Sequence, residues 1–203
     1  MSRSRTWSAQ ATNAFWHRAG SVYSDLRRKS AEELVKLDFD GYAVGGVSVG
    51  ETEEEMMKAV EDSEPYLPAH KARYAMGLGT PPQLVEMVAR GVDMFDCVLP
   101  TRVARNGTAF TREGTLNLNN ARFKDDSGPI EEGCQCPACR RFSRAYIRHL
   151  LNVDEILGLR LVSLHNLHFY LQLMRDVRKA IAEGTFQEFR TRFVSGYKKH
   201  NQV

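Results

Sequence analysis

Residues 72–98 read ARYAMGLGTPPQLVEMVARGVDMFDCV, and this stretch decides the fold. Its apolar start, 72–76, predicts a strand that ends at a glycine. Residues 81–90 have their apolar side chains at helical spacing, and residues 93–98 predict a second strand. A strand, a helix and a strand at this spacing are typical of a parallel β/α unit. The sequence therefore predicts an α/β protein with functional groups at the carboxyl ends of its strands.

The same pattern continues toward the N-terminus. Residues 42–44 predict a short strand that runs into two glycines, and residues 51–60 predict a helix with an acidic first turn. Residues 21–37 predict a further helix, within which Ser30 heads a Ser-x-x-Glu capping box. Several consecutive β/α steps are thus expected before residue 100.

The pattern changes after Pro100. Residues 101–120 are polar with some alternation and predict a short hairpin. Residues 169–182 predict an amphipathic helix, and aromatic side chains at helical spacing continue from 186 to 197, which is typical of a protein core. A hairpin and a helical region therefore follow the α/β part.

Length and composition limit the fold. The chain has 203 residues, 42% of them hydrophobic, and a mean hydropathy of −0.42, as in ordinary soluble globular proteins. No apolar run approaches the roughly 18 residues that a membrane-spanning helix needs. A complete eight-unit β/α barrel, which needs about 250 residues, does not fit.

Basic residues are concentrated in the C-terminal third. Residues 134–203 hold 12 Lys and Arg against 5 Asp and Glu, whereas residues 1–133 hold 16 against 20. A basic surface of this kind suits a polyanion such as RNA. A solvated helical surface without a partner is the alternative interpretation.

Three cysteines form the motif Cys134-x-Cys136-x-x-Cys139. This crowding, without a secretory signal, favours a metal site in a reducing cytosol over a disulfide framework. A tetrahedral zinc ion needs a fourth ligand, and four protein ligands make such a site structural.

The fourth ligand of this site could be a cysteine or a histidine. The remaining cysteine, Cys97, lies in a predicted strand, and the downstream candidates are His149, His165, His168 and His200. His149 lies in the helix directly after the cysteines, where folding back would be strained. We favour His165, which we expect just before a new helix where the chain can return, with His168 as the alternative.

A carboxylate, Asp96, ends the predicted strand 93–98. It either caps the following turn or serves as a functional group at the strand end. Arg102 and Arg105 follow it, and guanidinium groups beside such a position suit phosphate contact.

Seven motifs together resemble the tRNA-guanine transglycosylase family, from about residue 20 to 197. They are YAVGGVSVGE (42–51), RYAMGLG (73–79), FDCVLPTR (95–102), ARNG (104–107), CQCPAC (134–139), SRAYI (143–147) and HN (165–166).

The resemblance implies a base exchange at the wobble position of certain tRNAs, in queuosine biosynthesis. Asp96 matches the family's nucleophile, which attacks C1′ of the ribose, expels guanine and forms a covalent aspartyl-ribosyl intermediate. A 7-deazaguanine then displaces the aspartate, as in the double displacement of a retaining glycosidase. The target base must leave the anticodon stack to reach the carboxylate.

The resemblance also implies binding residues. Those matching the substrate-base site are Gly45, Gly46, Val47, Tyr74 and Met76. Those matching the tRNA-contacting segments are Gly77, Leu78, Gly79, Thr80, Pro81, Pro82 and Gln83, with Thr101, Arg102, Val103, Ala104 and Arg105. Those matching the ligands of one structural Zn²⁺ are Cys134, Cys136, Cys139 and His165. Val49 resembles the bacterial branch, whose substrate is an aminomethyl-deazaguanine.

For the fold, the resemblance implies the C-terminal part of a (β/α)8 TIM barrel. Residues 20–107 correspond to the last β/α units, 108–168 to an inserted zinc-binding subdomain and 169–203 to C-terminal helices. The general acid/base and the aspartate that pairs with the guanine edge belong to the half that this chain does not cover. The family further implies a cytoplasmic protein that forms a homodimer at full length and has no membrane segment.

Residues 1–19 depart from the family's pattern. Ala19 stands where the family has a glutamine, and a reading frame shifted by one nucleotide can spell the family's strand here. We expect an out-of-frame segment joined near Gly20, with a transit peptide or a disordered tail as alternatives. An accessory tRNA-binding subunit stabilised by zinc, or a non-functional fragment of a frameshifted gene, is accordingly the alternative to an enzyme.

Overall fold

The computed structural model describes residues 15–18, 23–45, 52–77 and 79–197. The chain divides into two compact units. Unit 1 comprises residues 1–77 and 87–96, and unit 2 comprises residues 78–86 and 97–203. Helix α3 (Pro81–Ala89) contributes residues to both.

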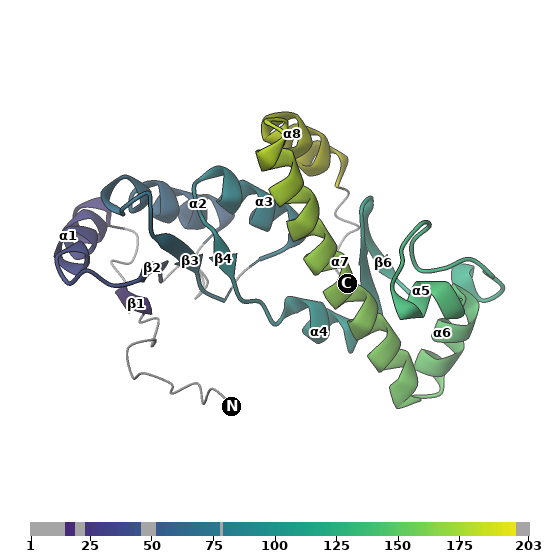
Figure 1. Ribbon diagram of the computed structural model, residues 1–203. Helices are drawn as coiled ribbons and strands as arrows, with labels where there is room; N and C mark the ends of the chain where they lie inside the picture. Colours follow the sequence, from purple (N-terminus) through teal and green to yellow (C-terminus); the bar gives the residue numbers. More distant parts are fainter. Residues whose placement is uncertain (1–14, 19–22, 46–51, 78, 198–203) are drawn as a thin grey trace, which may run out of the picture. The chain divides into compact units, whose positions relative to one another are not determined.

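Unit 1 is built on a parallel sheet in the strand order β1-β2-β3-β4. Its strands are β1 (Phe15–Arg18), β2 (Gly41–Val44), β3 (Ala72–Ala75) and β4 (Met94–Phe95). Its other elements are α1 (Ser24–Val35), α2 (Glu53–Glu61) and the 3-10 helix η1 (Glu64–Tyr66). Figure 1 shows the four strands side by side, with α1 and α2 next to them.

The parallel order confirms the α/β class and three of the expected strands. All four residues of β2 are buried, as is typical of a parallel strand covered on both faces. Because neighbouring parallel strands end at the same edge, Gly45, Met76 and Asp96 all follow strands at one edge of the sheet. The segment expected to be atypical, 1–19, contains β1, and its other residues lie outside the described residues.

The capping box expected at Ser30 is wrong. Helix α1 runs without a break through Ser30, and its buried residues, Arg27, Ala31 and Leu34, follow one helical face across that position. A capping residue must lie outside the helix, so an interior serine cannot act as one. The capping box of this unit lies at α2, where Thr52 accepts from the Glu55 amide and the Glu55 carboxylate accepts from the Thr52 amide.

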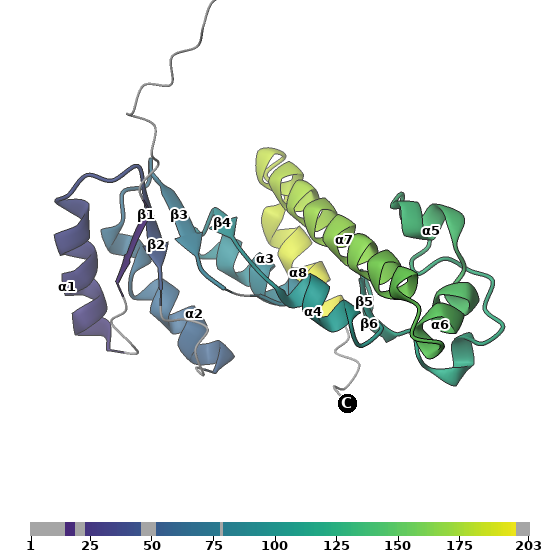
Figure 2. The same ribbon diagram turned by 90° about the horizontal axis from the view of Figure 1, so that it is seen from below.

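Unit 2 packs a hairpin and several helices around one long helix. Its elements are α4 (Leu99–Ala104), β5 (Thr108–Thr111), β6 (Gly114–Asn117), η2 (Ala121–Phe123), α5 (Pro137–Arg141), α6 (Arg144–Asn152), α7 (Ile156–Ala182) and α8 (Phe186–Gly196). Figure 2 shows α4 and the hairpin beside α7, with α6 near its N-terminal end. A buried apolar cluster that includes Leu118, Ile130, Ile147 and Val162 forms its core.

The hairpin expected within residues 101–120 is confirmed at residues 108–117, whereas Thr101 lies in helix α4. One helix start needs correction. The helix expected from residue 169 begins at Ile156, so His165 lies inside α7 and does not precede a new helix. The hydrophobic pattern predicts only the C-terminal part of α7, because leucines exposed on its N-terminal half obscure the helical period. The expected boundary at residue 168 falls within this helix, and the division at 19, 107 and 168 stays a prediction.

No helix in the described part of the chain has the length and apolar content needed to cross a membrane.

A candidate nucleophile and a metal centre

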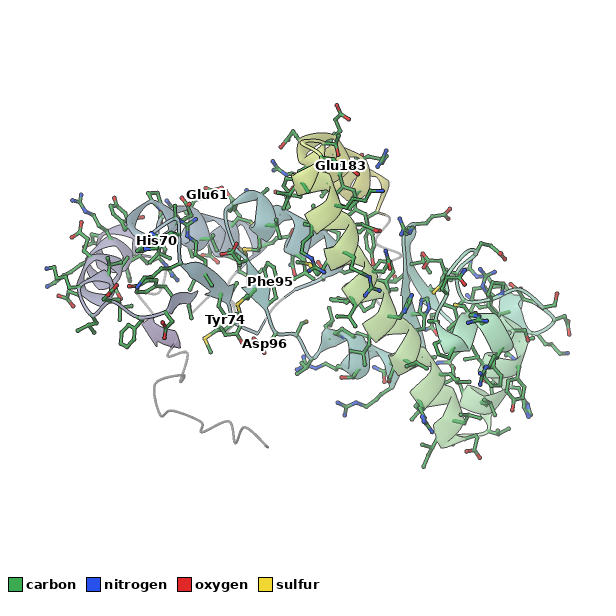
Figure 3. The ribbon with its side chains drawn as sticks, viewed as in Figure 1. Glu61, His70, Tyr74, Phe95, Asp96 and Glu183 are labelled. Atoms are coloured by element: carbon green, nitrogen blue, oxygen red, sulfur yellow. The ribbon has the colours of Figure 1, made fainter. Side chains whose placement is uncertain are left out.

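Asp96 directly follows β4, and its carboxylate is held by two donors from the neighbouring strand end. The Tyr74 hydroxyl of β3 donates to Asp96 Oδ1 at 2.6 Å, and the Gly77 amide donates to the same oxygen at 2.7 Å. Gly77 has a φ of 71°, a conformation that glycine adopts without strain. Figure 3 shows Tyr74 and Asp96 close together beside the strands. The carboxylate is oriented yet remains exposed to solvent.

These contacts keep the carboxylate ionised. The hydrogen bond from Tyr74, followed by that from the Gly77 amide, lowers the pKa of Asp96 below its ordinary value, although partial burial opposes this. The same bond raises the pKa of Tyr74, which therefore stays a donor. An ionised, oriented and exposed carboxylate has the properties that a nucleophile needs.

The expected base-binding residues are described in part. Gly45 is buried directly after β2, and its carbonyl accepts from Arg27 Nη1 at 3.3 Å. Met76 is half-buried after β3. Gly46 and Val47 lie outside the described residues.

Of the first segment expected to contact RNA, 77–83, residues 79 and 80 directly precede α3, and residues 81–83 are its first three residues. Within unit 2, the Gly79 amide donates to Cys97 Sγ at 3.3 Å, and Gln83 accepts from the Thr80 amide at 2.8 Å. Pro81 and Pro82 begin the helix and are buried, and Leu78 lies outside the described residues.

The second such segment, 101–105, lies on α4 and directly after it. Ala104 is fully buried, whereas Arg102 and Arg105 are exposed. The backbone here therefore buries the alanine side chain and leaves the guanidinium groups of Arg102 and Arg105 in solvent. Thr101 donates its hydroxyl to the Val98 carbonyl, and Val103 is half-buried.

Four residues converge in unit 2 as the sequence predicts. The ligand atoms of Cys134, Cys136, Cys139 and His165 all lie within 4.8 Å of one another. His165 Nδ1 lies 3.8, 3.6 and 3.3 Å from the sulfurs of Cys134, Cys136 and Cys139. A tetrahedral ion with bonds of about 2.3 Å to sulfur and 2.0 Å to nitrogen would separate these atoms by roughly 3.6 Å. His168, the alternative ligand, is not part of this group.

The imidazole is already oriented for an ion. His165 is fully buried, and its Nε2 lies 2.7 Å from the carbonyl oxygen of Phe110. A proton on Nε2 donates to this carbonyl and leaves the Nδ1 lone pair facing the three sulfurs. No local pattern pointed to Phe110, because this contact joins residues 55 positions apart.

The thiols also fit a cation. The hydrogen bond between the Cys136 and Cys139 side chains lowers the pKa of Cys136 and raises the pKa of Cys139. Closely spaced thiols cannot all ionise unless a positive charge lies beside them. The Cys136 sulfur also accepts from the Cys139 amide at 3.3 Å, so α5 begins at the site itself. Three thiols and an oriented imidazole form a closed set of four ligands for a metal ion.

Comparison with known proteins identifies the family of the chain. The family profile described as queuine tRNA-ribosyltransferase matches residues 1–199. A protein of that name from Symbiobacterium thermophilum is 59% identical over 175 residues, which are 86% of this chain and 44% of the relative. One from Staphylococcus aureus is 53% identical over 178 residues, 88% of this chain and 47% of the relative. The chain thus spans about half the length of these curated relatives. On the extent of the family match, the chain belongs to the queuine tRNA-ribosyltransferase family.

Proposed function

We infer that this chain provides the nucleophile for a base exchange on tRNA, in which guanine at the wobble position is replaced by a 7-deazaguanine. The observation that carries this inference is the Asp96 carboxylate, ionised and oriented by Tyr74 and Gly77 at a strand end, in a chain of this family. An exposed position leaves the carboxylate open to a ribose on a large RNA substrate.

The exchange takes place in two displacements. An oxygen of Asp96 attacks C1′ of the ribose, the bond from C1′ to the guanine nitrogen breaks, and guanine leaves with the electron pair and takes up a proton. The nitrogen of the 7-deazaguanine then loses its proton and attacks C1′, and the bond to Asp96 breaks. The carboxylate is restored, and two inversions at C1′ give net retention.

Two further sets of residues bind the two substrates in this proposal. We assign the incoming base to Gly45, Gly46, Val47, Tyr74 and Met76, and the anticodon loop to residues 77–83 and 101–105. The buried Gly45 supports this, since a backbone without a side chain admits a flat base closely. The exposed Arg102 and Arg105 suit phosphates.

The metal is zinc in this proposal. Three thiolates and one imidazole in a tetrahedral arrangement are the ligands that structural zinc prefers, and bound zinc would hold α5 and α7 together. The parallel sheet of unit 1 would belong to the last β/α units of a (β/α)8 barrel. We further propose a cytoplasmic protein and a homodimer at the family's full length.

Incorporation of labelled guanine into tRNA by the purified chain tests the function. Asp96→Asn should abolish incorporation, because an amide cannot form the glycosyl bond. Asp93→Asn is the matched control, since Asp93 accepts from the Arg73 amide and lies outside the strand-end site. Activity that survives Asp96→Asn would refute the role of this carboxylate.

RNA binding without exchange is the second candidate, and the excess of basic residues in 134–203 favours it. Gel-shift binding that Arg102→Ala and Arg105→Ala weaken, with no exchange, would support it. Arg144 is a poorer probe, because it donates to Asp126 at 3.0 Å and to the Ile130 carbonyl, so its loss would also disturb the fold.

A further inference from the structure

Helix α7 carries three buried polar side chains within two turns: His165, Asn166 and Tyr170. His165 is a ligand of the metal centre, whereas the proposed reaction gives no role to the other two. Buried polar groups require hydrogen-bond partners, so the partners of Asn166 and Tyr170 show what these residues hold in place.

Asn166 joins α7 to the hairpin and to α4. Its Oδ1 accepts from the Phe110 amide at 2.9 Å, and its Nδ2 donates to the Pro100 carbonyl at 2.9 Å and to the Thr108 carbonyl at 3.0 Å. Pro100 lies in α4, directly before the segment 101–105. One fully buried amide therefore fixes the helix that presents Arg102 and Arg105.

Phe110 connects this anchor to the metal centre. Its carbonyl contacts Nε2 of His165, and its amide donates to Asn166. Its ring packs edge-on against Tyr170, with centroids 5.3 Å apart. A shift of His165 on metal binding would thus move the backbone of Phe110, which Asn166 also contacts.

Tyr170 holds the other segment. Its hydroxyl donates to the Gly79 carbonyl at 3.0 Å, and the bond is buried. Gly79 belongs to the segment 77–83, so one helix contacts the backbone of both segments expected to bind RNA.

We propose that Asn166 and Tyr170 are positioning residues that couple the metal centre to these two segments, so that metal and RNA bind cooperatively. The RNA half of this proposal rests on the proposed function. Coupling of binding equilibria is reciprocal: if metal favours RNA binding, RNA must favour metal binding by the same factor.

Tyr170→Phe is the sharpest variant, because it removes one hydroxyl and keeps the ring. Tyr197→Phe is the matched control, since the buried Tyr197 hydroxyl has no hydrogen-bond partner among the described residues. Affinity for an RNA hairpin with guanine in its loop is measured by fluorescence anisotropy on the Zn²⁺-loaded chain. Zn²⁺ affinity is measured by chelator competition with and without that RNA.

In the unchanged chain and in Tyr197→Phe, RNA should tighten Zn²⁺ binding. Tyr170→Phe should weaken RNA binding roughly fivefold, as the loss of one buried hydrogen bond predicts, and should reduce the effect of RNA on Zn²⁺ affinity. Equal RNA affinity and an equal effect of RNA in the two tyrosine variants would overturn the coupling.

Asn166→Asp is the second variant. It keeps the acceptor for Phe110 but loses the donors to Pro100 and Thr108, so RNA binding should weaken more than in Tyr170→Phe. Asn152→Asp, at an exposed position on α6, controls for the added negative charge.

If the unchanged chain fails to bind the hairpin, the proposed function fails, and hydrogen exchange tests the positioning role independently of RNA. With Zn²⁺ bound, amides of residues 79–86 should exchange faster in Tyr170→Phe, and those of 99–105 in Asn166→Asp, than in the two controls. Unchanged protection in both segments would refute the positioning role.

Discussion

Asp96 accepts hydrogen bonds from Tyr74 and Gly77, and His165 donates one to the Phe110 carbonyl, so both side chains are oriented, but their surroundings differ. Asp96, in unit 1, is exposed, and the Tyr74 hydroxyl and the Gly77 amide both donate to one of its oxygens. His165, in unit 2, is fully buried among three sulfurs and a backbone carbonyl. An open carboxylate suits chemistry with an outside substrate, whereas a closed set of four ligands suits stability. Substitutions in the two regions should therefore affect different properties.

Loss of a metal ligand should have the largest effect and should fall on unit 2. A structural zinc contributes about 10–16 kcal/mol of apparent binding free energy, comparable with the whole stability of a domain, about 5–15 kcal/mol. We expect Cys136→Ala to lose the metal and most amide protection in α5, α6 and α7, measured by metal analysis and hydrogen exchange. Cys97→Ser, outside the cluster, should retain both. Full metal occupancy in Cys136→Ala would contradict the closed ligand set.

Substitution of Tyr74 should affect chemistry and leave unit 2 intact. Tyr74→Phe removes the largest cause of the lowered pKa of Asp96, so this pKa should rise toward 3.8. The lowered pKa stabilises the folded state above pH 3.8, and this contribution is lost as pH falls through the pKa of the folded state. In Tyr74→Phe this contribution should be smaller, the acid limb of exchange should lie at higher pH, and the rate at neutral pH should fall roughly threefold to tenfold. Carboxyl ¹³C titration of Asp96 measures the shift without requiring activity, and an unchanged titration would contradict the contact.

The smallest effect should come from the helix caps of unit 1. Thr52→Ala removes the capping box of α2 and should lower the free energy of unfolding by about 1 kcal/mol, measured by urea unfolding. Ser30→Ala should change it by no more than about 0.5 kcal/mol in either direction, because Ser30 lies inside α1. An equal loss in both variants would restore the capping role expected for Ser30.

Local pattern predicted much of unit 1. Alternating strands and helices with glycines at the strand ends give the parallel order of β2, β3 and β4, and they place Asp96 at a strand end. The error at Ser30 has a physical reason, because a Ser-x-x-Glu spacing arises inside helices as well as at their start. In α1 the turn before Ser30 is already helical and buries Arg27, so the serine lies inside the helix.

In unit 2 the metal ligands could be predicted from the sequence, but the long-range hydrogen bonds of α7 could not. The cysteine spacing predicted the metal centre, and the choice of His165 agrees with the geometry, although the argument from a chain return was wrong because the residue lies within α7. The anchors of Asn166 and Tyr170 had no local signal, because their partners lie 56 to 91 residues away. Such contacts depend on how the helix packs, which spacing along the chain does not reveal.

The most direct test of the central claim is mass spectrometry of the chain mixed with tRNA, quenched under denaturing conditions and digested with protease and nuclease. A ribosyl adduct on the peptide that contains Asp96, present in the unchanged chain and absent in Asp96→Asn, is the predicted result. An adduct on another peptide, or base exchange without any adduct in the unchanged chain, would contradict the nucleophilic role of Asp96.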